Sequence, residues 1–188
     1  MTSEPDEPDK FVEPAVSAAF IAQAREFLAH DYLPKIERCL AGLSDTDLWW
    51  RANEESNSIG NLFLHLCGNA RQWIVCGLGG APDRRVRQTE FDERSSIPKG
   101  ELLSQLRDTL GQVDSVLAEF DQTRLLETYR IQQSDVTALE AIFHVTEHFS
   151  MHTGQIILLT KLLAKKDLRF YDFSTGEPLH TWHDPKST

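Results

Sequence analysis

Cysteine is scarce in this sequence. Its three cysteines, Cys39, Cys67 and Cys76, are spread over a chain of 188 residues and form no C-x-x-C pair. A small, odd number of widely spaced cysteines gives no disulfide framework and is typical of proteins from a reducing compartment. We therefore expect a cytoplasmic protein without structural disulfides.

Long hydrophobic runs are also missing. Hydrophobic residues make up an ordinary 40% of the chain, but no apolar stretch approaches the roughly 20 residues that a membrane span needs. The N-terminus is acidic and proline-rich, where a signal peptide would carry a basic and then an apolar region. We expect no membrane association. Residues 1–12 are interpreted as a disordered acidic tail, and residues 13–188 as one domain.

Positive charge is in short supply. The chain has 19 lysines and arginines against 29 aspartates and glutamates, which gives a formal net charge of −10. An acidic surface repels the phosphate backbone of nucleic acids, and this disfavours general nucleic-acid binding.

Apolar residues recur with the helical period in four segments, and no segment has a convincing strand pattern. A short extended stretch at residues 129–132 is the one exception. Four amphipathic segments with short or long connections predict an all-α protein, a four-helix bundle. The predicted helices are residues 14–42, interrupted or kinked at Pro34; 58–77, capped by Asn57 or Ser58; 98–120; and about 135–165, capped by Ser134.

Two adjacent tryptophans follow a short predicted turn. Ser44 and Asp47 have the spacing of a capping box, and Leu48, Trp49 and Trp50 come next. Adjacent side chains point in different directions. The simpler interpretation is that both fill the core; the alternative is that one of them covers a cavity or an interface.

The last predicted helix carries three histidines at four-residue spacing. Side chains four apart lie one above the other on a helix, so two imidazoles can reach one metal ion. With about 100° per residue, His152 lies in the middle of the apolar stripe, His148 about 40° to one side and His144 about 80°. The outer two are about 12 Å apart along the axis, too far for one tetrahedral ion. We predict that His148 and His152 are ligands and that His144 lies beside them.

A competing interpretation uses the same segment. His144, Glu147 and His148 match the H-x-x-E-H signature of some zinc peptidases, in which the histidines are ligands and the glutamate is the base. By helical phase Glu147 points well over 100° away from the apolar stripe. The signature is short, so it carries little weight by itself.

A third ligand is predicted on the helix 58–77. Beside its apolar stripe runs a polar stripe without lysine or glutamate, which suits a wet cavity better than a solvated face. Its histidine, His65, is the predicted third ligand. Asn69 and Gln155 are polar neighbours that cannot titrate, so no general base is identified. His180 and His183 are further candidates, although histidines near a terminus are usually exposed to solvent.

The connection 77–97 has no helical period and is long for a compact domain, so it is either functional or a crossover. It carries Arg84, Arg85, Arg87 and Arg94 in an otherwise acidic chain. One interpretation is a solvated loop in which neighbouring acids, including Glu90, neutralise the arginines. The other is a basic lip, with Arg84, Arg85 and Arg87 as the candidates to receive an anionic substrate.

Two stretches resemble the DinB-like (DinB/YfiT) superfamily of metalloenzymes. They are NSIGNLFLHLCGNARQW at residues 57–73 and EHFSMHTGQI at residues 147–156, and the similarity extends over most of residues 14–170, closest to a branch with NSIGNL and HTGQI signatures. The resemblance implies an up-down-down-up four-helix bundle with a long crossover between helices two and three. It also implies that His65, His148 and His152 hold a Zn or Ni ion and that the protein is a homodimer.

The resemblance implies an activity as well. Relatives include transferases and isomerases that use low-molecular-weight thiols, and other relatives are hydrolases. Three neutral histidines leave a fourth position open, as catalytic zinc sites do. We therefore expect a metal-dependent enzyme that activates a thiol or water and whose small-molecule substrate is an anionic thiol. The alternative is a non-catalytic metal-binding or stress-related interaction protein.

Overall fold

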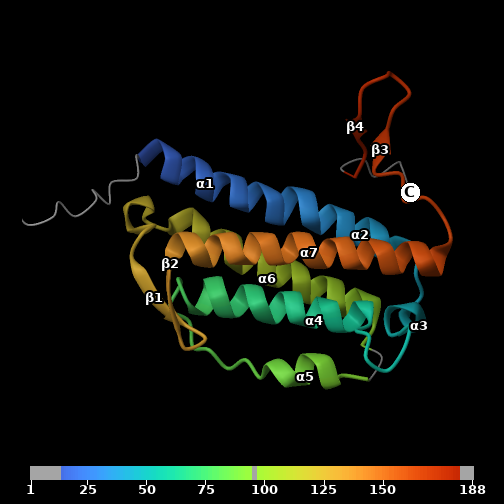
Figure 1. Ribbon diagram of the computed structural model, residues 1–188, viewed down its shortest axis with the longest axis horizontal. Helices are drawn as coiled ribbons and strands as arrows, with labels where there is room; N and C mark the ends of the chain where they lie inside the picture. Colours follow the sequence, from blue (N-terminus) through green and yellow to red (C-terminus); the bar gives the residue numbers. More distant parts are fainter. Residues whose placement is uncertain (1–13, 95–96, 183–188) are drawn as a thin grey trace, which may run out of the picture.

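The structure, a computed structural model, describes residues 14–94 and 97–182; the predictions for the tail 1–12 and for His183 lie outside these residues. Four long helical segments lie side by side (Figure 1). In chain order the helices are α1 (Pro14–Glu26), the π-helical turn η1 (Phe27–Tyr32), α2 (Leu33–Ala41), α3 (Asp45–Leu48), α4 (Ile59–Ala70), the π-helical turn η2 (Arg71–Cys76), α5 (Arg87–Asp92), α6 (Lys99–Glu119), the 3₁₀ turn η3 (Gln122–Arg124) and α7 (Ala138–Ala164).

Within the described ranges, strands form two small antiparallel pairs. They are β1 (Thr128–Ile131) with β2 (Ser134–Thr137), and β3 (Tyr171–Asp172) with β4 (Leu179–His180). The predicted all-α class is therefore confirmed for the bulk of the described chain. None of the described helices is both long and apolar enough to cross a membrane.

The long helices run in two opposite directions. In Figure 1, α1, α2 and α7 run one way along the long axis, and α4 and α6 run the other way. α4 packs against both α6 and α7, and α7 also packs against α2. Fully buried side chains from these helices, such as Ile36, Phe63, Leu106 and Phe149, meet between them. Each contributes about 1.5–3 kcal/mol through burial of apolar surface.

Capping boxes fix three of the helix starts. Ser44 and Asp47 cap α3 as predicted, and Ser58 caps α4 together with Asn61. The predicted Ser134 cap of the last helix is wrong, because Thr137 and Glu140 form that cap. Residues 134–137 instead pair with β1.

The hairpin between β1 and β2 explains the late start of α7. Gln132 and Gln133, which connect its strands, have φ of 50° and 67°. Two successive residues with positive φ are the signature of the type I′ turn that two-residue hairpins favour. Residues 129–132 were predicted to be extended, and β1 covers most of that stretch.

Pro34 interrupts the first segment as predicted. The backbone widens into η1 just before the proline and returns to α-helix in α2. A proline ring clashes with the carbonyl four residues earlier and cannot donate to it, and a π-helical turn relieves that crowding.

The two tryptophans have different roles. Trp49 packs against Gly60 of α4, and its Nε1 donates to the carbonyl of Ile97 at 3.1 Å. Trp50 is 40% exposed. Trp49 therefore fills the space between α3 and α4, as the simpler interpretation has it, whereas the exposed Trp50 does not fill the core.

The segment after α7 folds back over α2. Leu168 and Trp182 are buried, whereas Tyr171 and Phe173 are exposed. The Arg38 guanidinium on α2 donates to the carbonyl oxygens of Arg169 and Thr181. This segment therefore packs on the helices at its two ends, and its middle projects as the β3–β4 hairpin (Figure 1).

Candidate metal centre

Three histidines from two facing helices meet in the interior. His65 comes from α4, and His148 and His152 come from α7 one turn apart. One ring nitrogen from each lies within 4.8 Å of the other two. All three residues are buried, with 5%, 9% and 8% of their surface exposed. These are the histidines that the sequence analysis grouped, and they lie close enough together to bind one metal ion.

Each of two rings turns its Nδ1 away from the cluster. His65 Nδ1 lies 2.8 Å from Glu90 Oε2, and His152 Nδ1 lies 2.7 Å from Gln155 Oε1. Both oxygens are acceptors, so the proton of each neutral ring is assigned to Nδ1. This tautomer leaves Nε2 with a lone pair, which is the form in which histidine binds a metal.

The Nε2 atoms of the cluster lack suitable hydrogen-bond partners among the described side chains. His152 Nε2 is buried and lacks a hydrogen bond among the described residues. His148 Nε2 lies 3.0 Å from His65 Nε2, where two lone pairs repel unless one nitrogen is protonated or a cation lies between them. Buried polar atoms without partners are rare in native proteins. A divalent cation held by three imidazoles would satisfy these atoms, so the residues present fit a metal ion.

Burial favours the neutral forms of the two histidines on α7. It lowers the pKa of His148 to about 3, and the charges of the neighbouring histidines act in the same direction. Burial also lowers the pKa of His152 below its ordinary value, which the contact with Gln155 partly offsets. His148 and His152 are therefore unprotonated at neutral pH, and protons compete little with an ion for these two rings.

His144 lies beside the cluster. Its Nε2 is 3.1 Å from Asn69 Nδ2, and its ring lies 4.1 Å from the Trp73 ring, centroid to centroid. Asn69 Oδ1 and Trp73 Nε1 are buried without a hydrogen bond among the described residues. Polar atoms thus continue along α4 and α7 from the three histidines. His180 lies on β4 after the end of α7, with its ring stacked on Trp182.

The H-x-x-E-H interpretation does not match this geometry. Glu147 is exposed on α7, and the His144 ring is held by Asn69 and Trp73. The ligand atoms that converge belong to His65, His148 and His152. A general base at Glu147 would have to act from the opposite side of the helix.

The crossover between α4 and α6 brings a carboxylate that the sequence analysis did not place at the site. Residues 77–97 were predicted to have no helix, but residues 87–92 form α5, which packs against α4. Phe91 anchors it, with its ring 4.8 Å from the His65 ring. One apolar residue in a single helical turn leaves too little periodicity to detect. Glu90, on the same turn, is buried against His65.

Arg85 forms a buried ion pair with the Glu90 carboxylate. Its Nε donates to Glu90 Oε1 at 2.6 Å and its Nη2 to Glu90 Oε2 at 2.8 Å. The neutralising interpretation of the loop therefore applies to Arg85. Arg84 and Arg87 are exposed; the guanidinium of Arg87 lies over the Phe91 ring, and Arg84 borders a hollow of about 400 Å³ beside η2.

The chain is similar to one protein family and to a solved structure. A family described as proteins of unknown function, DUF1572, matches residues 15–177. The chain belongs to the DUF1572 family. A solved structure, the conserved protein of a locus from Enterococcus faecalis, is 16% identical, has a TM-score of 0.59 and covers 83% of this chain and 99% of its own. That likeness concerns the fold alone. No curated protein is similar.

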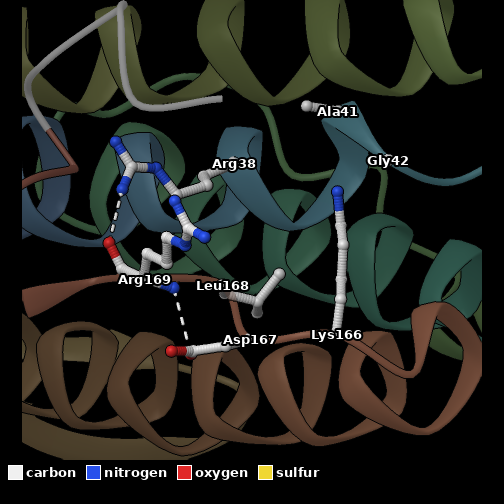
Figure 2. A pocket seen from close by; sticks show the side chains of 7 residues that line it. All are labelled: Arg38, Ala41, Gly42, Lys166, Asp167, Leu168 and Arg169. Atoms are coloured by element: carbon white, nitrogen blue, oxygen red, sulfur yellow. Dashed lines mark hydrogen bonds between the residues drawn. The ribbon is translucent and has the colours of Figure 1, made fainter.

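A second hollow of this DUF1572 protein lies at the other end of α7. Figure 2 shows its lining, in which Arg38, Lys166 and Arg169 surround a space of about 380 Å³. α2 and α7 both end beside it, and helix C-termini carry partial negative charge. The basic residues therefore have an electrostatic reason to gather there without a ligand.

Proposed function

We propose that this protein is a metal-dependent enzyme of the DinB-like superfamily, with an up-down-down-up four-helix bundle and one divalent ion, Zn or Ni, held by His65, His148 and His152. The observation that carries the proposal is the buried His152 Nε2, which has no hydrogen-bond partner among residues 14–94 and 97–182 and lies within 4.8 Å of two more imidazole nitrogens. Imidazole suits both metals. The motifs around these histidines support the placement in the superfamily.

The chain's own residues would prepare the site for chemistry. Glu90 and Gln155 orient the rings of His65 and His152 from behind, so that the Nε2 lone pairs converge. Three protein ligands leave room for one exogenous group. A divalent ion would lower the pKa of a thiol or a water molecule bound in that position.

The substrate is proposed to be a low-molecular-weight anionic thiol. A thiol prefers Zn or Ni over harder ions, and its carboxylates need cationic partners. Arg85 is committed to Glu90 on the Nδ1 side of His65, away from the converging nitrogens. Arg84 and Arg87 are thus the cations of the crossover that remain accessible for such a substrate.

A second candidate function is a non-catalytic metal-binding or interaction protein. What favours it is the lack, among the described residues, of a carboxylate that faces the converging nitrogens; His144 lies beside them, but its Nε2 contacts Asn69 Nδ2. Asn69, Gln155 and Trp73 cannot titrate in the neutral range, and Glu147 is exposed. The two functions differ in whether the loaded protein transforms a thiol.

Metal analysis of protein purified without an affinity tag tests the first step. We expect about one Zn or Ni per chain, and strong loss of metal in His65→Ala, His148→Ala and His152→Ala. His180→Ala, which changes a histidine outside the cluster, is the matched control. Full stoichiometry in His65→Ala protein would contradict the ligand set.

Conjugation assays test the second step. The loaded protein is incubated with electrophiles and a panel of carboxylated and uncharged thiols. An enzyme should turn over a thiol only when loaded and only with all three histidines intact. Metal binding without turnover of any thiol or hydrolysable ester would favour the non-catalytic function.

A further inference from the structure

A carboxylate from the crossover contacts the back of one proposed ligand. Glu90 lies on α5, outside the four long segments, and its Oε2 is 2.8 Å from His65 Nδ1. The two residues are 25 positions apart, and their side chains are only 9% and 6% exposed. A buried contact of this kind between the crossover and α4 can affect the His65 ring as well as hold α5 in place.

The chemistry of the contact determines where the His65 proton lies. Arg85 donates to both oxygens of Glu90, at 2.6 and 2.8 Å, so the carboxylate is held as the anion of an ion pair. An ionised carboxylate can only accept, so His65 must donate from Nδ1. Arg85 Nη2 lies 3.2 Å from the same Nδ1 and could donate to a bare nitrogen. The carboxylate oxygen at 2.8 Å decides between the two, because two lone pairs at that distance would repel.

Two further residues hold Glu90 in place. Arg85 binds both of its oxygens. Gly68, one turn after His65 on α4, makes the space: a Cβ there would lie 2.1 Å from Glu90 Oε1 and 2.8 Å from Arg85 Nε. Glycine inside a helix costs about 1 kcal/mol relative to alanine. Glycine is needed at this position because any side chain would collide with the buried Glu90–Arg85 ion pair.

We propose that Glu90 is a positioning residue for His65 and that docking of α5 onto α4 sets the affinity of the three-histidine site for its ion. The inference rests on the proposed metal function. Glu90 fixes the tautomer that leaves Nε2 free and makes the ring a better electron donor. By linkage, a bound ion must stabilise the docked crossover to the same extent.

The rival account is that Arg85 and Glu90 form an ordinary buried ion pair that only packs α5. Under that account, removing the carboxylate lowers stability but leaves the affinity of a folded protein for metal unchanged. Affinity of the folded state and the protonation of His65 therefore separate the two accounts.

The experiment measures ion affinity of the full-length, untagged protein by chelator competition with Zn²⁺ and Co²⁺. Glu90→Gln removes the charge but keeps an acceptor, and Glu90→Ala removes both. Asp92→Asn, on the exposed side of the same short helix, is the matched control. Gly68→Ala displaces the ion pair without changing its charge, and Gly111→Ala, where a Cβ meets nothing within 4 Å, is its control.

We expect roughly 10- to 100-fold weaker ion binding in Glu90→Ala and Gly68→Ala, the range found for partners of metal-bound histidines. Glu90→Gln should lose less than Glu90→Ala, and both controls should bind like the wild type. Hydrogen exchange of residues 85–94 should slow when the ion binds. A folded Glu90→Ala protein with wild-type affinity would overturn the proposal.

The tautomer of His65 can also be measured directly in ion-free protein, which tests the proposal independently of metal binding. Long-range ¹H–¹⁵N spectra of the ion-free wild type should show His65 protonated at Nδ1 and bare at Nε2. A proton on Nε2 would overturn the proposal, including the case in which Glu90→Ala does not fold. If the wild type binds no ion at all, the proposed function fails, while the tautomer still shows whether Glu90 orients His65.

Discussion

Removing the ion should cost stability without unfolding the helices. The histidines lie in a core that other residues build: Phe63, Leu66 and Phe149 are fully buried around them and need no metal to associate. This differs from a zinc finger, which is unfolded without its ion. Circular dichroism at 25 °C should therefore show the same helical signal before and after EDTA.

The magnitude follows from ligand linkage. Free ion at 100 times its dissociation constant stabilises the folded state by about 2.7 kcal/mol. One kcal/mol moves the melting temperature of a chain of this size by about 2–4 °C. Chelation should thus lower Tm by roughly 5–10 °C under those conditions. The shift should grow with free metal concentration, which thermal scans at several concentrations would measure.

A substitution sharpens this prediction. His152 Nε2 has no partner in the part of the chain that the structure describes, so His152→Ala removes a buried polar atom that is unsatisfied without the ion. The variant should melt close to ion-free wild type and should gain nothing from added metal. Loss of the helical signal on chelation, or a metal-dependent rise in Tm that survives in His152→Ala, would refute the reasoning.

Other properties can be predicted in the same way. His144→Ala should bind metal nearly as well as wild type in the stoichiometry assay, and complete loss would revive the H-x-x-E-H interpretation. Between pH 7 and pH 5 the free energy of unfolding of the ion-free protein should fall by about 1 kcal/mol, after allowance for solvent screening. The reason is that the pKa of His148 is about 3 in the folded protein, whereas the unfolded chain takes up the proton near the ordinary pKa of 6.5. Urea titrations that give equal stability at pH 7 and pH 5 would contradict this. Gly60→Ala should cost about 1–3 kcal/mol in the same titrations, since its Cβ would lie 2.8 Å from the Trp49 ring. We propose that the homodimer implied by the resemblance uses the exposed apolar residues of α7, such as Met151 and Leu158. Leu158→Lys, at a residue 59% exposed, should then shift light scattering from dimer to monomer, and a wild-type monomer would reject the dimer.

Helical periodicity predicted the long elements well because each has many turns. The stripe centred on His152 extends over the whole of α7, so the phase of every histidine could be worked out from the pattern alone. That phase placed His148 and His152 toward the interior and His144 to one side, as the structure has them. His65 was found through a different signal, a polar stripe on α4 that lacked charged residues.

Short elements gave much weaker signals. Ser134 has the chemistry of a helix cap, but pairing of residues 134–137 with β1 is a contact with another segment, which a cap pattern cannot reveal. Thr137 and Glu140 have the spacing of a capping box three residues later. The β-branched pair Val136 and Thr137 was the local sign that the strand continued to that point.

Glu90 shows most clearly why a site cannot be completed from helical phase. Phase relates residues within one helix, and it says nothing about a single turn that docks from a crossover. In the sequence Glu90 is one of several acids that could neutralise the arginines, and it does neutralise Arg85. The same carboxylate also reaches His65, because Gly68 leaves the space for it on α4. The sequence shows only Gly68, beside the polar stripe of α4, and several acids in the crossover; neither feature indicates that the two meet. The neutralising and functional interpretations of the loop were therefore not exclusive: the arginine that is neutralised holds the carboxylate that we propose orients the ligand.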